Sequence, residues 1–158
     1  MVLSVRMTSA TVRRRLAAAT IDGAGCAVII ALPYALGLFS VAPLLEAKGM
    51  FLLDHWLVLL GRHPATLASP PLWALSVWCL WQFVWTYFSA GRTPGGRLCS
   101  VQVVDRYGDP LTLERAALRA FGHMICGLSG GLGWLWALAS QERRTWADLL
   151  SGSYSLHR

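Results

Sequence analysis

Three ionisable side chains stand in or beside apolar sequence, where a charge needs a partner. Arg15 and Asp22 lie at the start of one apolar run, and Asp148 follows the last apolar run. A charge at the centre of a membrane-spanning helix costs about 3 kcal/mol or more on insertion scales. Arg15 and Asp22 are seven residues apart, close to two helical turns, so they share one helix face. The three residues therefore form the candidate site.

Two interpretations of this site remain open. In the first, Arg15, Asp22 and Asp148 form a buried ionic cluster that fastens the N-terminal helix to the C-terminal turn. In the second, Asp22 accepts a proton or cation in a polar cavity between helices. Asp148 also fits a capping arrangement, because Thr145 stands three residues before it. Capping and pairing with Arg15 are compatible.

The composition indicates an all-α membrane protein. Of the 158 residues, 55% are hydrophobic and 14% are charged, whereas a soluble domain carries roughly a quarter charged residues. A helix needs about 20 apolar residues to cross a bilayer. Residues 16–40 and 72–89 therefore predict two transmembrane helices. A third apolar segment, residues 118–140, has several glycines in its middle.

The basic residues predict the topology. Four lie in residues 1–15, five in 90–120 and three in 141–158, so these segments are expected in the cytoplasm, and residues 41–71 outside. A cytoplasmic C-terminus favours a re-entrant hairpin of two short helices, 118–128 and 132–140, over a plain third span. The alternative, a third span with the C-terminal turn 141–158 outside, stays open.

The two connecting segments have their own expected elements. Outside, residues 50–60 predict a helix on the membrane surface, with prolines at 64, 70 and 71 breaking the chain before the second span. The cytoplasmic connector, residues 90–117, predicts a strand over 98–104, a turn and a helix capped by Thr112. Residues 153–156 are expected to pair with the strand. Four arginines of the connector region are expected at lipid headgroups: Arg92, Arg97, Arg115 and Arg119.

Aromatic residues form a stripe along the second span. They recur at three and four residues, which places them on one helix face. Together with an aromatic residue of the outward segment they make a possible docking surface: Trp78, Trp81, Trp85, Phe88 and Trp56. Packing or lipid contact is the simpler interpretation of such a stripe.

The sequence offers no catalytic or metal-binding spacing. The four cysteines are scattered without a CxxC pair, and no nucleophile–histidine arrangement falls on one loop. We therefore expect no enzyme activity, no metal and no cofactor. The net charge of +6 follows from membrane topology and requires no nucleic-acid partner.

Three segments resemble the RDD family of membrane proteins, named for one arginine and two aspartates. They are RRLAAATID (14–22), GRTPGGRLCSVQVVDRYGDPLTLERAALR (91–119) and RRTWADLLSGS (143–153). The resemblance implies that Arg15, Asp22 and Asp148 are the named residues. Residues 42–70 match no motif of the family. Transport, including cation/proton antiport, has been proposed for such proteins.

Together these observations predict a multi-pass protein of the bacterial cytoplasmic membrane with a cytoplasmic N-terminus. We expect an accessory or assembly subunit that contacts lipids and other membrane subunits. The alternative is an oligomeric transporter component with Asp22 as coupling carboxylate, because so few helices hardly enclose a path alone.

Overall fold

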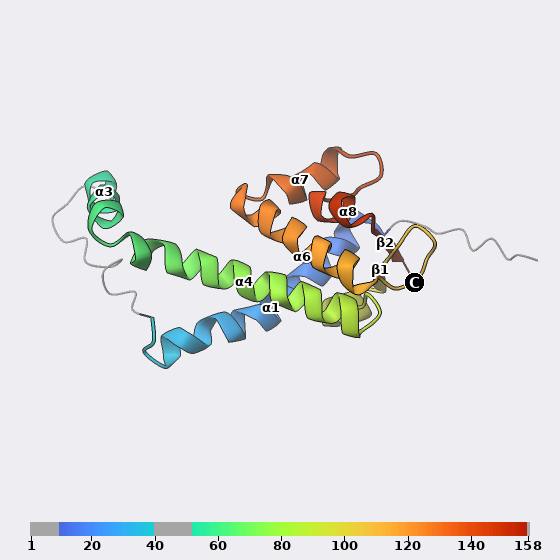
Figure 1. The fold of residues 1–158 in the computed structure, drawn as a ribbon, viewed down its shortest axis with the longest axis horizontal. Helices are drawn as coiled ribbons and strands as arrows, with labels where there is room; N and C mark the ends of the chain where they lie inside the picture. Colours follow the sequence, from blue (N-terminus) through green and yellow to red (C-terminus); the bar gives the residue numbers. More distant parts are fainter. Residues whose placement is uncertain (1–9, 40–51, 158) are drawn as a thin grey trace, which may run out of the picture.

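The computed structural model describes residues 10–39 and 52–157. These residues form a mostly helical bundle with a two-stranded sheet at one end (Figure 1). In chain order, the elements are α1 (Val12–Ala35), α3 (Leu52–Arg62), α4 (Pro64–Phe88), α5 (Pro94–Leu98), β1 (Val101–Val104), α6 (Leu113–Leu128), α7 (Leu132–Ala139), α8 (Trp146–Ser151) and β2 (Tyr154–His157).

Helix α1 covers residues 16–35 of the expected first span, 16–40. Among the helices of the described residues, it alone is long and apolar enough to cross a membrane by length and composition. Arg15 lies in its first turn and Asp22 about 10 Å further along the axis, from a rise of ~1.5 Å per residue. The helix ends at Ala35, before the expected Ser40, and Gly37 follows it with a φ of 70°.

Helix α4 begins earlier than expected. It starts at Pro64 and continues through Pro70 and Pro71, so the predicted break before residue 72 is wrong. A proline in the first helical turn loses no hydrogen bond, and later prolines keep a helical φ while removing an N–H. The two interior prolines therefore cost hydrogen bonds without ending the helix. A second membrane crossing over 72–89 remains a prediction.

The segment that is expected outside contains helix α3, Leu52–Arg62. The expected helix over 50–60 falls largely on it, although residues 50 and 51 lie outside the described part. The side chain of Trp56 also lies outside that part. Its position at the headgroup level stays a prediction.

The third apolar segment bends back on itself. Helix α6 is one continuous helix from the capping Thr112, whose hydroxyl accepts from the Arg115 amide, to Leu128. At the bend, Gly130 and Gly131 have φ angles of 67° and 91°, which glycine adopts without steric cost. The Gly131 amide donates to the Cys126 carbonyl at 2.8 Å. The two helices α6 and α7 therefore form a hairpin at residues 129–131, and whether it enters the membrane stays a prediction.

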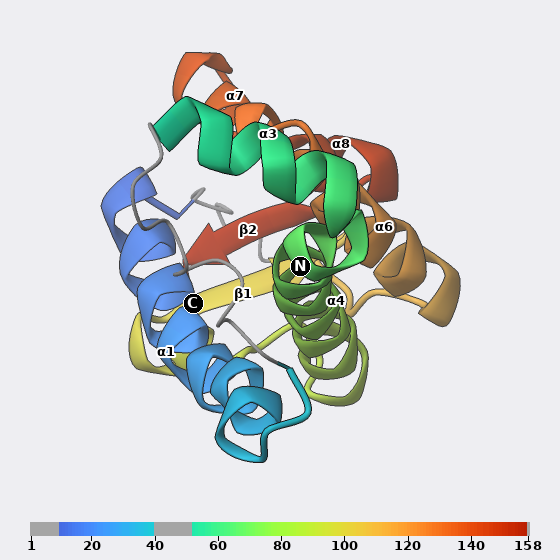
Figure 2. The ribbon, with the colours of Figure 1, turned by 90° about the vertical axis from the view of Figure 1, so that its left-hand side faces the viewer.

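The sheet joins the middle of the chain to its end. Strands β1 and β2 are antiparallel, with Val101 opposite His157 and Val104 opposite Tyr154. They lie side by side at the end of the bundle (Figure 2). The amide of Ala10 donates to the Ser155 carbonyl at 2.9 Å, so the start of α1 is held beside β2.

Helix α5 lies against α1 at a point where only glycine fits. A Cβ at Gly95 would overlap the backbone carbonyl of Ala18. The expected strand over 98–104 is accordingly shorter than predicted, because Leu98 ends α5 and β1 begins at Val101.

We predict that Gly95→Ala destabilises the protein by about 1–3 kcal/mol, because the methyl group must push α5 away from α1. Thermal unfolding of the purified chain in detergent measures the effect. Gly23→Ala is the matched control, since nothing lies within 4 Å of a Cβ at that helical position. Equal stability of Gly95→Ala and Gly23→Ala would refute this close packing.

Candidate functional site

The carboxylate of Asp148 lies at the centre of the charged site. Its Oδ2 accepts from Arg15 Nη2 at 2.6 Å and from the Thr145 amide at 3.0 Å. Its Oδ1 accepts from Arg119 Nη1 and, at 3.4 Å, from the Ser153 hydroxyl. We call Arg15, Arg119 and Asp148 the ionic latch. It connects α1, α6 and α8.

The local sequence positions this carboxylate. Thr145 is the N-cap of α8, and its hydroxyl accepts from the Asp148 amide at 3.2 Å. The carboxylate returns a bond to the Thr145 amide, which completes a capping box. The capping interpretation and the pairing with Arg15 are therefore both realised in one residue.

The arginines of the latch make further bonds. Arg15 Nη1 donates to the Arg143 carbonyl, and Arg119 Nη1 also donates to the Ser153 hydroxyl at 2.9 Å. Beside them, Arg144 donates to the Asp148 carbonyl at 3.1 Å and lies 4.3 Å from the ring of Tyr154. The bonds to Arg143 and Ser153 fix the direction of the guanidinium groups of Arg15 and Arg119.

Asp148 stays ionised in this setting. Burial raises the pKa of its carboxyl, because Asp148 is fully buried, but Arg119 and Arg15 lower it more. The net pKa lies well below the ordinary aspartate range. A carboxylate offers about four acceptor positions, and four donors already bind this one. A cation would have to displace one of them.

Asp22 is placed differently from the expected cluster. Its Oδ1 accepts from the backbone amide of Gly95 at 2.8 Å, and no arginine of the described residues lies within ion-pair distance of it. Arg15 lies about 10 Å from Asp22 along the axis of α1. It pairs instead with Asp148 of α8. Asp22 and Thr93, whose hydroxyl accepts from Gly96, satisfy two free amides at the start of α5.

The four arginines expected at lipid headgroups separate into two groups. Arg92 and Arg97 are exposed; Arg92 donates to Gln102 at 3.2 Å, and Arg97 lies 5.8 Å from the ring of Trp85. Arg115 forms an ion pair with Asp105 at 3.2 Å. Whether these three contact lipid stays a prediction.

Arg119, by contrast, does not lie at an exposed position where it could contact lipid headgroups. It is 5% exposed and belongs to the ionic latch. The buried face of α6 includes Ala116, Arg119, His123 and Cys126, at spacings of three and four residues. That spacing is the signal that sequence reasoning missed, because an arginine on an apolar stripe needs a buried carboxylate.

The aromatic stripe of α4 turns largely inward. The Trp78 ring lies edge-on to His123, with centroids 6.4 Å apart. Trp81 contacts Trp85, at 5.6 Å between ring centroids, and lies against α1 at Gly25. Phe88, by contrast, is 74% exposed. Trp78, Trp81 and Trp85 are partly buried, and a docking role for the stripe stays a prediction.

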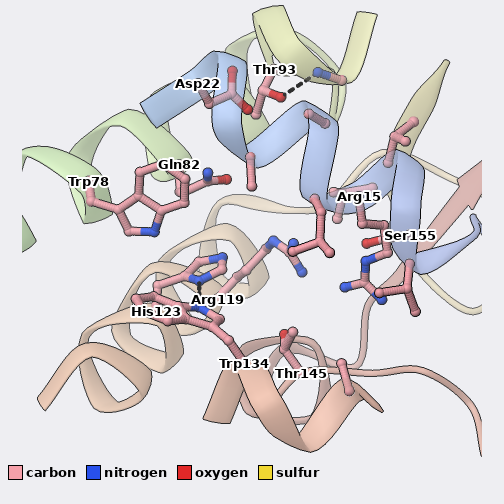
Figure 3. Close-up of a pocket in the computed structure, with 18 of the residues that line it drawn as sticks. Arg15, Asp22, Trp78, Gln82, Thr93, Arg119, His123, Trp134, Thr145 and Ser155 are labelled. Atoms are coloured by element: carbon pink, nitrogen blue, oxygen red, sulfur yellow. Dashed lines mark hydrogen bonds between the residues drawn. The ribbon is translucent and has the colours of Figure 1, made fainter. Parts of the chain in front are cut away.

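A cavity of about 520 Å³ lies between α1, α4, α6 and α7 (Figure 3). Asp22 and Gln82 line one side, and Arg119, His123 and Trp134 line another. The indole Nε1 of Trp134 donates to His123 Nδ1 at 3.1 Å. No group of three metal-ligating side chains occurs within residues 10–39 and 52–157.

We predict that Asp148→Asn destabilises the protein by about 3–5 kcal/mol, because the buried Arg119 and the partly buried Arg15 lose their counter-charge. Chemical or thermal unfolding in detergent measures the loss. Asp109→Asn, at an exposed turn position, is the matched control and should change stability little. If Asp148→Asn does not change the stability, the carboxylate of Asp148 acts only as a helix cap.

The contribution of Asp148 to stability should fall at low pH. Because the folded state lowers the pKa of Asp148, its contribution is present above the unfolded pKa of about 3.9 and is lost as pH falls through the folded pKa. We predict that the stability gap between wild type and Asp148→Asn narrows by about 1 kcal/mol between pH 5 and pH 3. A gap that widens over this range would contradict the lowered pKa.

Comparison with known proteins gives one match. The family model described as "RDD family" matches residues 9–152, which include the ionic latch, Asp22 and every residue that lines the cavity except Ser155. Comparisons with curated proteins and with solved structures found no match. The match confirms the resemblance of the three motifs, and it covers most of the chain. This chain belongs to the RDD family of membrane proteins.

Proposed function

We propose that this chain is a small accessory or assembly subunit of a larger bacterial membrane complex, in which the ionic latch maintains the shape of the protein. The observation that carries the proposal is the saturation of Asp148. Four donors occupy its carboxylate, and it is fully buried. Such a site fastens helices; it has no free position for a substrate or a transported cation.

The outer surface of the long helices supports an interaction role. Val28, Leu32 and Leu36 at the end of α1 are more than half exposed, as are Leu80 and Phe88 on α4. Apolar patches of this kind need lipid or another apolar protein surface around them. In a membrane complex, these faces contact lipids and neighbouring subunits.

The membrane orientation belongs to the same proposal. The basic residues among residues 1–15 and in the segment 90–120 support a cytoplasmic N-terminus in a bacterial inner membrane. Under this arrangement the ionic latch and the sheet lie at the cytoplasmic end of the bundle. The protein then crosses the membrane more than once.

A second candidate function rests on Asp22. Its carboxylate is 2% exposed, lines the cavity and has no basic partner within ion-pair distance among the described residues. A buried carboxylate beside a cavity suits proton or cation exchange. In that case the chain is one component of an oligomeric transporter, with Asp22 as the coupling group.

Native mass spectrometry after gentle extraction from the native membrane distinguishes the two functions. We predict that the tagged chain is recovered in stoichiometric association with other membrane subunits. A homo-oligomer without other subunits would contradict the subunit proposal and favour transport.

Asp22→Asn gives a second, independent test. If the chain is a subunit and Asp22 has a structural role, the Asp22→Asn variant should be less abundant or less well assembled. The reason is that the amide of Gly95 loses a charged acceptor. Abundance in the membrane and cation or proton flux in vesicles are the two measurements. A variant that is fully abundant and assembled but has lost flux would support the transporter instead.

A further inference from the structure

The cavity beside Asp22 opens between α1 and α7. Leu16 of α1 and Leu135 and Leu138 of α7 line it, yet these side chains are 61%, 57% and 64% exposed. They therefore form an apolar mouth at the bundle surface. Among the described helices, α1 is the one that is long and apolar enough to cross a membrane. A mouth beside this helix therefore suits a molecule that enters from the membrane phase.

Inside the cavity, two aromatic side chains keep hydrogen-bond donors without acceptors. His123 Nδ1 accepts from Trp134 Nε1, which can only donate. The His123 ring is therefore neutral and carries its proton on Nε2. This Nε2 and Trp78 Nε1 are buried and have no hydrogen-bond partner within the described part of the chain. Both residues line the cavity.

A buried donor without an acceptor is costly, about 1–3 kcal/mol. The two donors belong to rings that lie edge-on to each other, with centroids 6.4 Å apart. His123 itself is 6% exposed. The chemistry that completes this end of the cavity is a hydrogen-bond acceptor, such as a carbonyl oxygen.

The charges around the cavity balance. Its ionisable lining consists of Arg15, Arg119 and Asp22, together with the neutral His123. Asp148 binds both arginines directly, so two positive charges face two negative ones. A charged headgroup would find no net opposite charge here, which favours an uncharged ligand.

We propose that this cavity binds an uncharged, membrane-dissolved molecule through a carbonyl oxygen that accepts from His123 Nε2 and Trp78 Nε1. The apolar body of the molecule lies along Leu16, Leu135 and Leu138 and leaves through the mouth. Both a quinone ring and the acyl ester of a neutral lipid present this chemistry. The site is independent of whether the chain acts as a subunit or as a transporter.

Native mass spectrometry of the full chain in detergent tests the site with three probes: decylubiquinone, dioleoylglycerol and oleate. We expect one of the two neutral carbonyl probes to bind with 1:1 stoichiometry and tighter than the anionic oleate. Decylubiquinone binding assigns a quinone, and dioleoylglycerol binding assigns an acyl ester. Absence of 1:1 binding by both neutral probes, or tighter binding of oleate, would overturn the proposal.

Variants locate the bound probe. Trp78→Phe removes the indole N–H together with the five-membered ring, so the affinity should fall about fivefold, and His123→Phe should lower it about tenfold. Trp81→Phe is the matched control: its Nε1 is also buried and without a partner among the described residues, but Trp81 does not line the cavity. Equal affinities of Trp78→Phe and Trp81→Phe would overturn the assignment, even if His123→Phe fails to fold.

Discussion

The buried carboxylate of Asp148 is the constraint on which the rest of the fold depends. A fully buried charge is tolerated only when opposite charges and hydrogen bonds replace its water. Arg15 comes from α1 and Arg119 from α6, whereas the capping amide comes from the start of α8 itself. Removing Asp148 would leave both arginines without their counter-charge, and removing either arginine would take one of the two cations from the buried carboxylate. The ends and the middle of the chain are therefore held at one point, beside the sheet in which β2 pairs with β1.

The two aspartates that the family name denotes have different partners. Asp148 binds side-chain cations, whereas Asp22 binds the backbone amide of Gly95 and so ties α5 to α1. The absence of a side chain at Gly95 is what lets α5 come close enough to Ala18 for this bond. As a result, one carboxylate is fully saturated while the other borders a cavity. Any chemistry or binding in this chain is more readily sought beside Asp22 than at the ionic latch.

Much of this arrangement is predictable from sequence, because local rules decide it. The hairpin bend follows from adjacent glycines, the start of α8 from Thr145 and Asp148, and the pairing of Arg15 with Asp148 from the cost of buried charge. The role of Arg119 is less readily predictable. Its spacing from Ala116 and His123 fits the buried face of α6, but its spacing from Arg115 suits an exposed face equally well, and the packing of α8 decides between burial and exposure. The inward turn of Trp78 and the partner of Asp22 likewise depend on contacts between distant segments.

The ion pair of Arg15 with Asp148 fastens α1 to α8 in this structure. A double-mutant cycle of Arg15→Gln and Asp148→Asn, measured by the free energy of unfolding in detergent, tests this role. We predict strong coupling between the two residues. The double variant should be at least as stable as the less stable of the two single variants. Additive losses, within about 0.5 kcal/mol, would show that the two residues act independently and would contradict the claim.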